Sequence, residues 1–416
     1  MPRQLWYITK YFVPEDENSA GSRGWQLVKH LDQTRYQTIV FTSDANMFLY
    51  REPSQDAKSE ETKNGIQLVF LRTLKYQSAR SFRRILGWLH FELELFLTPK
   101  QSYPRPDIIL VSSLSIFTIV NGLYFKWRYK CPLLFEIRDI WPLTLVEEDG
   151  FSRFHPAILA MAWLEKLGYL GADRIIGTMP NLVEHVTKVT GKNLPVSCLP
   201  MGVSNLQTSE RTPISQVFRA KYFSPDKMSV VYAGTIGITN ALDAFFDAAR
   251  LCSQIEDIEF IVVGDGDLKE KYMKMTSDLH NVRFAPRVPK NQVQAVLESA
   301  DVLYFSTFYS EVWRYGQSLN KLTDYMLSGK PIIGSYSGYP SMINEADCGL
   351  FVEAENPQAL FEAFVFMLEM PIAERTEMGQ RGPEWLLENR PYSKLAESFS
   401  DLLDEATDKY KSSEHA

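Results

Sequence analysis

The order of apolar strands, glycine-bearing turns and amphipathic helices constrains the fold of this chain more than any other feature. A short apolar segment at 4–9 leads through a small-residue turn at 19–24 into a helical pattern. The same order returns at 228–249, where an apolar segment is followed by Gly234, Gly237 and an amphipathic helix. Because strands that alternate with helices build parallel sheets, we expect an α/β protein with two Rossmann-like, doubly wound domains facing a central cleft.

Polar segments mark the predicted boundaries of these domains. The stretch 207–213, Q-T-S-E-R-T-P, contains no apolar core residue and is typical of a linker. We therefore expect a first domain at 1–206, a second at 214–385 and a final helical segment at 386–416. Another polar stretch, 54–63, is predicted to be a surface loop of the first domain.

Composition and charge limit the range of functions. The formal net charge is −7 and the pI is about 5.6, which argues against a nucleic-acid-binding protein. The four cysteines are scattered, and no histidine lies at ligand spacing from them, so we expect reduced thiols in a cytoplasmic protein and no metal site. No apolar run approaches the roughly 18 residues of a membrane-spanning helix, and residues 1–14 do not have the pattern of a secretory signal, so we expect a protein that is neither membrane-spanning nor secreted.

One basic stretch departs from this acidic average. Between residues 72 and 90 no acidic residue interrupts a series of cations interleaved with aromatic and aliphatic residues. The cations are Arg72, Lys75, Arg80, Arg83 and Arg84. A basic amphipathic helix suits an anionic membrane surface, so Arg72 to Trp88 is one predicted contact with such a surface. The alternative is a solvated helix whose apolar side belongs to the core.

The stretch 314–333 has the pattern of a helix whose start can hold an anion. Ser318 is the predicted N-cap, Lys321 falls in the first turn, and Gly329 supplies the stop. The amides that would form the seat for a phosphate belong to Gln317, Ser318, Leu319 and Asn320. The alternative is a capped amphipathic helix packed on a sheet.

Two further places could meet a ligand. Arg138 and Asp139 follow an apolar strand pattern, so both side chains would lie at the carboxyl edge of the sheet, where open α/β sheets bind ligands. Asp139 alone could equally be a helix cap. In the turn at 19–24, Gly21 would let the backbone approach a ligand and Arg23 would meet an anion, although a plain structural turn explains the same residues.

Two of these segments carry a resemblance to a known family. S-L-N-K-L-T-D-Y-M at 318–326, with G-K-P at 329–331, resembles the donor-nucleotide helix of retaining GT-B glycosyltransferases of family 4. R-D-I-W-P at 138–142 resembles the acceptor-site wall of the same branch, which includes bacterial surface-polysaccharide enzymes. The resemblance implies the GT-B fold, with the last helix crossing back to the first domain.

The activity that the resemblance implies is glycosyl transfer. The donor is a nucleotide diphosphate sugar, with a UDP-sugar favoured, and the acceptor is a hydroxyl of a glycan or of a polyprenyl-diphosphate-linked saccharide. Transfer proceeds with retention and without a metal or a cofactor, in polysaccharide or glycoconjugate biosynthesis. We expect the protein in the cytoplasm. A peripheral position on the inner face of the cytoplasmic membrane is a second expectation.

The resemblance also assigns roles to residues. Asp139 contacts or orients the acceptor hydroxyl, Arg138 holds it or its anion, and Lys321 neutralises the leaving diphosphate. The residues expected to bind the donor are Gly21, Arg23, Gly234, Gly237, Arg287, Val288, Ser318, Leu319, Asn320 and Asp324. Asp324 takes the place of the family's ribose-binding glutamate, whereas the family's other glutamate falls on Gly316. The donor-sugar contact is therefore left to backbone amides or Glu311.

Two other functional classes stay open at this point. A catalytically silent GT-B scaffold, which would bind a nucleotide sugar without transferring it, is favoured by the absent side chain at Gly316. A GT-B nucleotide-sugar epimerase would need several histidines and carboxylates in its cleft, and the histidines of this chain stand apart from any such motif.

Overall fold

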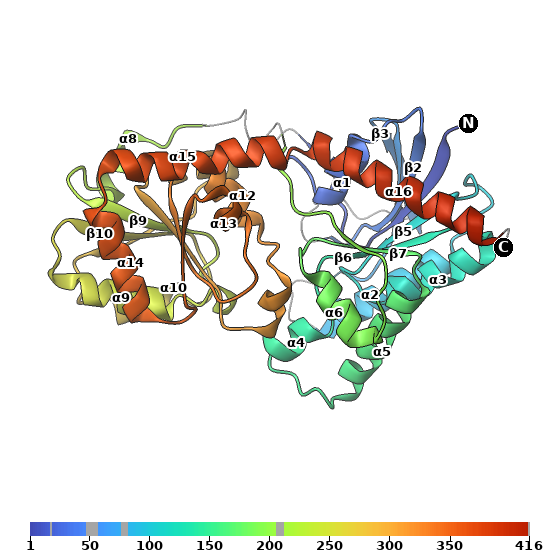
Figure 1. Ribbon diagram of the computed structural model, residues 1–416, viewed down its shortest axis with the longest axis horizontal. Helices are drawn as coiled ribbons and strands as arrows, with labels where there is room; N and C mark the ends of the chain where they lie inside the picture. The colour runs from blue at the N-terminus through green and yellow to red at the C-terminus, as the bar shows by residue number, and fades with distance from the viewer. Residues whose placement is uncertain (17–18, 47–56, 76–81, 205–211, 415–416) are drawn as a thin grey trace. The chain divides into compact units, whose positions relative to one another are not determined.

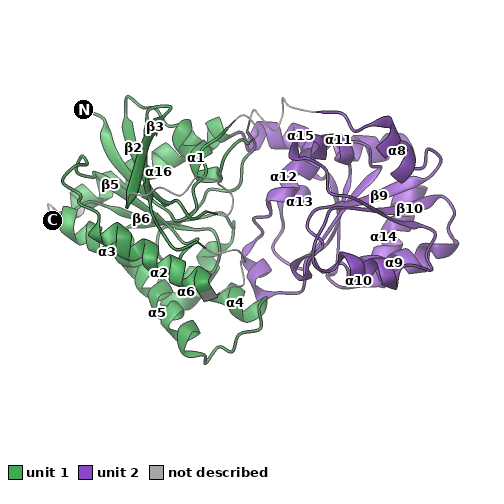
Figure 2. Cartoon of the chain, turned by 180° about the vertical axis from the view of Figure 1, so that it is seen from behind, with its two compact units in different colours: residues 1–202, 392–416 green, residues 203–391 purple. Residues whose placement is uncertain are grey.

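The structure, a computed structural model, describes residues 1–16, 19–46, 57–75, 82–204 and 212–414. The chain divides into two compact units (Figure 2): unit 1 comprises Met1–Gly202 with Tyr392–Ala416, and unit 2 comprises Val203–Pro391. The divisions at 202 and 391 compare with 206 and 385 in the prediction. Helix α15 (Ile372–Asn389) runs through the predicted boundary, and Pro391 separates it from α16 (Tyr392–Glu414).

Unit 1 is built around an eight-stranded sheet of order β3-β4-β2-β1-β5-β6-β7-β8. Its strands are β1 (Arg3–Ile8), β2 (Tyr36–Ser43), β3 (Lys58–Lys63), β4 (Ile66–Leu71), β5 (Ile108–Ser112), β6 (Leu133–Ile137), β7 (Arg174–Gly177) and β8 (Val196–Cys198). Its other helices are α1 (Arg23–Lys29), α2 (Phe82–Leu97), α3 (Thr118–Tyr129), α4 (Leu143–Glu147), α5 (Pro156–Gly171) and α6 (Leu182–Thr190). From the central pair β1 and β5, the sheet continues through β2, β4 and β3 on the side of β1, and through β6, β7 and β8 on the side of β5. The carboxyl ends of β1 and β5 therefore flank the topological switch point, where open α/β sheets bind ligands.

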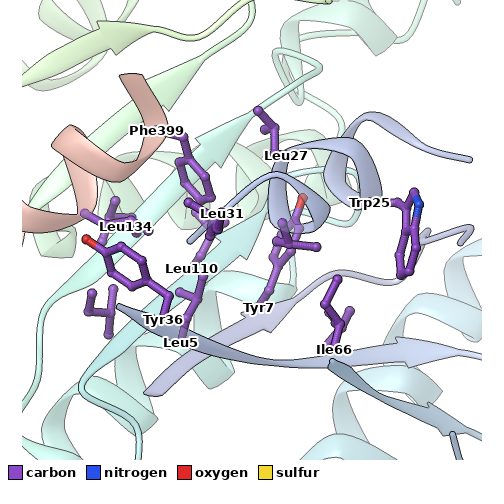
Figure 3. Packing of buried hydrophobic residues seen from close by; sticks show 14 of the residues in the cluster. Leu5, Tyr7, Trp25, Leu27, Leu31, Tyr36, Ile66, Leu110, Leu134 and Phe399 are labelled. Atoms are coloured by element: carbon purple, nitrogen blue, oxygen red, sulfur yellow. The ribbon is translucent and has the colours of Figure 1, made fainter. Parts of the chain in front are cut away.

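Helices cover both faces of this sheet, so its strands are apolar on both sides. Leu5 and Tyr7 of β1 face the layer of α1 and α16, where Phe399 of α16 packs into the same cluster (Figure 3). Trp6 points to the opposite layer and lies edge-on to Phe125 of α3, with ring centroids 5.8 Å apart. Helix α16 thus completes the core of unit 1 although it follows unit 2 in the chain (Figure 1).

The prediction of a surface loop at 54–63 is wrong for its described part. Lys58–Lys63 forms β3, which pairs antiparallel with β4 from Lys58↔Leu71 to Lys63↔Ile66. Asn64 and Gly65 connect the two strands with φ of 49° and 73°. An Asn-Gly pair adopts such a turn readily, so this dipeptide was the hairpin signal that the polar composition obscured.

Unit 2 has a six-stranded sheet of order β11-β10-β9-β12-β13-β14 whose neighbours all run parallel. The strands are β9 (Met228–Ala233), β10 (Ile258–Val263), β11 (Val282–Ala285), β12 (Val302–Ser306), β13 (Ile332–Ser335) and β14 (Gly349–Val352). The α-helices other than α15 are α8 (Gln216–Tyr222), α9 (Asp243–Leu251), α10 (Lys269–Met275), α11 (Val293–Leu297), α12 (Asn320–Leu327), α13 (Met342–Ala346) and α14 (Pro357–Glu369). Short 3-10 helices are η1 (Ile238–Asn240), η2 (Cys252–Gln254), η3 (Lys290–Gln292) and η4 (Glu311–Tyr315). Here the switch point lies between β9 and β12.

Aromatic packing fixes this second sheet between its helices. On one face Phe245 of α9 stacks on Tyr304 of β12, with ring centroids 4.5 Å apart, and also contacts Phe364 of α14. On the other face Leu322 and Met326 of α12 belong to a separate buried cluster. Within the described residues, no helix is long and apolar enough to cross a bilayer.

Candidate functional site

The switch point of unit 2 brings α12 against the carboxyl end of β9. The Tyr325 hydroxyl on α12 accepts a hydrogen bond from the main-chain amide of Ala233 at 2.9 Å and donates one to the Ala233 carbonyl at 2.9 Å. Ala233 is the last residue of β9, and Gly234 follows it. These two bonds hold the start of α12 beside the Gly234 loop.

Lys321 occupies the space that this arrangement creates. Its Nζ donates to Asn240 Oδ1 and lies 5.1 Å from the ring centroid of Tyr232. A Cβ built on Gly234 would lie 3.7 Å from the same nitrogen. Burial lowers the pKa of the Lys321 ammonium to about 8. Within the described residues no carboxylate forms an ion pair with it, so a ligand anion would supply its missing countercharge.

The start of α12 differs from the prediction. Ser318 was expected to be the N-cap, but Leu319 holds that position with φ −81° and ψ 115°, and no side chain caps the helix. The first turn closes on Leu319 because the Leu322 amide donates to the Leu319 carbonyl at 3.1 Å, which leaves Ser318 outside the helix. The first amides of a helix without a side-chain cap are donors for an external acceptor.

The loop before α12 explains why the resemblance breaks at Gly316. Gly316 has φ 115° and ψ 175°, a conformation that is essentially restricted to glycine. A glutamate at this position would strain the backbone. The next residue, Gln317, has both amide atoms of its side chain buried without a hydrogen-bond partner among the described residues. Buried amide groups rarely stay unpaired, so Gln317 is a candidate ligand contact.

The glycines after β10 hold the Gly234 loop in place. A Cβ on Gly264 would lie 1.9 Å from the Gly234 carbonyl oxygen, and one on Gly266 would lie 2.3 Å from that of Ile236. The Ile236 amide donates to the Asp265 carbonyl at 2.9 Å. The two loops therefore pack main chain against main chain, and only glycine fits at these contacts.

The remaining donor-site candidates of unit 2 are Gly237, Asp324, Arg287 and Val288. Gly237 precedes η1 with φ −132° and an almost open Cβ direction. Asp324 is partly buried on α12, where its main-chain carbonyl accepts a bond from Gln294 Nε2 at 2.9 Å. Arg287 is exposed in the loop after β11, and Val288 is partly buried against the core.

Two residues that contact Lys321 were not predicted from the sequence. Asn240 and Tyr232, which position the Lys321 ammonium, were not assigned a role from the sequence. Asn240 stands 81 residues from Lys321, and no motif links the two. Only the tertiary structure joins them.

In unit 1, Arg138 and Asp139 follow β6 at the carboxyl edge of the sheet. Ser113, after β5, links them, because the Arg138 amide donates to its Oγ at 3.0 Å and that hydroxyl donates to the Asp139 carbonyl at 3.2 Å. Burial raises the pKa of the Asp139 carboxyl, against the opposing charges of Arg138 and Arg84. The Nε of Arg138 is buried without a partner among the described residues.

Two further charged residues interact with Asp139. From the sequence, Glu148, with Glu147 and Asp149, is an alternate to Asp139 for the acceptor contact, and Arg84 is assigned to a membrane surface. Burial, Asp139 and Asp149 raise the pKa of Glu148 to about 7, so this carboxyl titrates near neutral pH. Arg84, which is partly buried, places its guanidinium carbon 4.9 Å from the ring centroid of Trp88 and 5.8 Å from that of Trp141, and its predicted membrane contact stays a prediction. Trp88, an aromatic residue of the basic stretch, is thus a cation–π partner of Arg84 in the same stretch.

The 19–24 turn has a structural explanation. The Arg23 side chain is buried, forms an ion pair with Glu136 and donates to the carbonyls of Leu199 and Pro200. A Cβ on Gly21 would lie 2.7 Å from the Val13 carbonyl oxygen. A ligand contact for Gly21 and Arg23 stays a prediction. In the described part of the chain no group of three or more His, Cys, Asp or Glu residues is placed to hold a metal ion.

Solved structures with this fold cover nearly the whole chain. Sucrose-phosphate synthase from Thermosynechococcus elongatus has a TM-score of 0.70 at 16% identity, covering 97% of this chain and 98% of that one. Anabaena HepE in complex with UDP has a TM-score of 0.67 at 13% identity, covering 97% and 100%. An E. coli structure titled trehalose-6-phosphate, bound with UDP-2-fluoro glucose, has a TM-score of 0.71 at 10% identity, covering 96% and 98%.

Comparison of the sequence with known families matches only part of the chain. A search of curated proteins gives no match. Residues 227–370 match the family model described as Glycosyl transferases group 1. The chain therefore has the GT-B fold of its structural neighbours, and the group 1 glycosyltransferase match falls on the part of unit 2 that contains Gly234, Lys321 and Asp324.

Proposed function

We propose that this protein is a retaining, metal-independent glycosyltransferase that moves a sugar from a nucleotide diphosphate sugar to an acceptor hydroxyl. The observation that carries the proposal is the Lys321 ammonium, buried beside the uncapped start of α12 with no carboxylate partner among the described residues. The group 1 match to residues 227–370 supports it, as do neighbours whose titles name UDP or a UDP-sugar. UDP-sugars are therefore the favoured donors.

The proposed donor roles use residues of unit 2. The Lys321 ammonium and the first amides of α12 stabilise the negative charge that develops on the leaving diphosphate. Asp324 accepts hydrogen bonds from the ribose, and the main chain at Arg287 and Val288 meets the base. Ser318, Leu319 and Asn320 contribute main-chain amides, and Gly234 and Gly237 let the loop approach the phosphates. With Gly316 unable to carry a carboxylate, Gln317 takes the contact to the donor sugar.

The experiment that tests the function is thermal unfolding with UDP, GDP, ADP, TDP and their sugars, followed by assay of transfer to glycan and lipid-linked acceptors. Saturation at about 100 times Kd stabilises a folded state by about 2.7 kcal/mol. We expect a clear shift with UDP and its sugars. Stabilisation without transfer would favour a silent scaffold, and no stabilisation by any nucleotide would contradict the proposal.

Binding of the nucleotide diphosphate should weaken above pH 8. Below about pH 8 the Lys321 ammonium is already charged in the free protein, so binding takes up no proton there. Above that pH the lysine is mostly neutral, and an anion must recruit a proton, which lowers affinity about tenfold per pH unit. Calorimetric titration with UDP between pH 7 and about pH 9 in buffers of different ionisation enthalpy measures both effects. A pH-independent affinity would contradict the role of Lys321.

Asp139 is proposed to orient the acceptor hydroxyl, with Arg138 holding the acceptor or its anion. Asp139→Asn keeps the side-chain shape but removes the charge, so we expect transfer to fall about a hundredfold or more. Stabilisation by UDP should stay unchanged, because Asp139 belongs to unit 1, whereas Lys321 and the first amides of α12, which are proposed to hold the diphosphate, belong to unit 2. Glu148 provides a second readout, since loss of the Asp139 charge should lower its pKa from about 7.

The biological setting is part of the proposal. A glycan or a polyprenyl-diphosphate-linked saccharide as acceptor would place the reaction in polysaccharide or glycoconjugate biosynthesis. The enzyme would then work in the cytoplasm, at the inner face of the cytoplasmic membrane. Fractionation of cells that produce the protein, followed by a salt wash of the membranes, tests this placement.

A further inference from the structure

The outward face of α2, α3 and α5 in unit 1 is unusually apolar. These three helices lie side by side in the layer that covers one face of the sheet (Figure 2), with α3 in the middle. Their exposed large hydrophobic residues are Leu86, Leu89, Leu93, Phe96, Leu97, Val120, Tyr124, Trp127, Leu159, Trp163, Leu167 and Leu170. We call this set the apolar face. Scattered exposed apolar residues are ordinary, but a continuous patch of this kind marks an interaction surface.

The apolar face is not a product of an incomplete core. The same helices bury other residues toward the sheet, among them Trp88 of α2, Phe125 of α3 and Met161 of α5. Trp127 and Trp163 nevertheless remain 74% and 64% exposed. Three adjacent helices are thus apolar on both sides, whereas a solvated surface helix is polar on its outer side.

The charges on this face have one sign. The exposed charged residues of α2, α3 and α5 are Arg83, Arg128 and Lys166, and none of the exposed residues of these helices is acidic. The acidic residues of these helices have partners: Glu92 accepts hydrogen bonds from Thr118 and Asn121, and Glu165 bonds to His185. Glu94, whose side chain is 27% exposed, lies 3.2 Å from His90 Nε2. The whole chain has a net charge of −7, so an outer face whose exposed charges are all positive differs from the average of the protein.

A basic cavity adjoins the end of α3. It has a volume of about 520 Å³, and its lining includes four cations and no carboxylate. The cations are Lys100, Arg105, Arg128 and Lys130. Lys100 donates to the carbonyls of Leu95 and Thr98, and Arg105 donates to that of Tyr129, so both also cap helix ends. Arg128 belongs to the cavity and to the outer surface of α3 at once.

We propose that the apolar face is a docking surface for an anionic lipid bilayer, with Trp127 and Trp163 in the interfacial region and the flanking cations against lipid phosphates. Interfacial binding needs this pairing of aromatic and aliphatic side chains with lysine and arginine. A second copy of the chain fits less well, because a two-fold interface would pair this face with itself and bring its cations together without exposed acidic residues of the same helices to compensate them. The apolar face includes Leu86 and Leu89 of the basic stretch and lies beside the exposed Arg83, whereas Arg84 of the same stretch lies over the rings of Trp88 and Trp141.

The docking surface deepens the membrane placement given under the proposed function, and vesicle flotation tests it without any nucleotide or sugar, so its outcome is distinguishable from that of the transfer assay. The purified full chain is mixed with vesicles of phosphatidylcholine alone, or of phosphatidylcholine with phosphatidylglycerol. We expect the protein to float with the anionic vesicles, to bind the neutral ones more weakly, and to be released in part by high salt.

Two variants and a matched control locate the contact. Trp127→Ser with Trp163→Ser should lower the bound fraction about tenfold. Arg128→Gln with Lys166→Gln should lower affinity for anionic vesicles about fivefold per charge and leave the weak binding to neutral vesicles unchanged. Phe366→Ser changes an exposed aromatic residue of α14 in unit 2 and should float like wild type.

Three results would overturn the proposal. The wild type could remain at the bottom of the gradient with both kinds of vesicle. The double tryptophan variant could float as well as the wild type. Sedimentation velocity could instead show a dimer that the double tryptophan variant dissociates, in a protein that binds no vesicles. Equal melting temperatures of all variants check that the exposed substitutions leave the fold intact.

Discussion

Replacing Lys321 with methionine is expected to abolish stabilisation by nucleotide diphosphates and to reduce glycosyl transfer by a factor of about 100 to 1,000. Methionine matches the length of the lysine stem but cannot neutralise a phosphate. The free protein should be no less stable than wild type, because the substitution removes a buried ammonium that lacks a carboxylate partner among the described residues. Thermal unfolding with and without UDP, together with a transfer assay, measures all three effects.

Lys330→Met provides the matched control for this experiment. Lys330 follows α12 and precedes β13, so it lies at the opposite edge of the sheet from the carboxyl ends where Lys321 is placed. Its loss should change neither UDP stabilisation nor transfer. Asn240→Ala, which removes the acceptor of the Lys321 bond, should give an intermediate loss. Full UDP stabilisation of the Lys321→Met variant would contradict the donor site.

Replacing Gly264 with alanine is expected to destabilise unit 2 by about 3 kcal/mol or more. The new Cβ would lie 1.9 Å from the Gly234 carbonyl oxygen, and φ at this residue is 151°, so both the contact and the backbone oppose it. Relief of the clash must displace the Gly234 loop, which should also weaken UDP binding. Urea unfolding followed by tryptophan fluorescence and by circular dichroism measures the loss.

Gly237→Ala separates this effect from a general cost of adding a methyl group in the loop. A Cβ there meets only Thr235 Cγ2, at 3.7 Å, and φ is −132°. The change in the free energy of unfolding should stay within about 0.5 kcal/mol. Equal destabilisation by the two substitutions would contradict the packing of the Gly264 loop against the Gly234 loop.

Much of the architecture follows from local pattern. The two αβ halves, the strands that open them and a helix carrying Lys321 and Asp324 could be predicted, because buried parallel strands are apolar on both sides and helices repeat every 3.6 residues. Helix ends were less predictable. Ser318 has a good capping side chain, but the turn closes on Leu319, which shows that loop geometry can override capping preference.

Three features of the structure departed from prediction or were not predicted at all. Polar composition suggested a loop where Lys58–Lys63 forms an edge strand, because an edge strand needs main-chain bonds more than apolar side chains. Arg84 seemed a surface charge until the fold placed it over Trp141. The exposed side of α2, α3 and α5 could not be recognised either, since periodicity alone does not separate an outer apolar stripe from the core.

The sequence by itself determined the order of elements, the glycine turns after the first strand of each half and the motif that places Lys321 in a first helical turn. The tertiary structure alone decided what surrounds that lysine. Asn240, Tyr232 and Gly234 reach it from the loop and strand across the switch point, and burial there lowers its pKa to about 8. The reason is physical: local pattern governs backbone conformation, whereas desolvation and charge compensation depend on groups that only folding brings together.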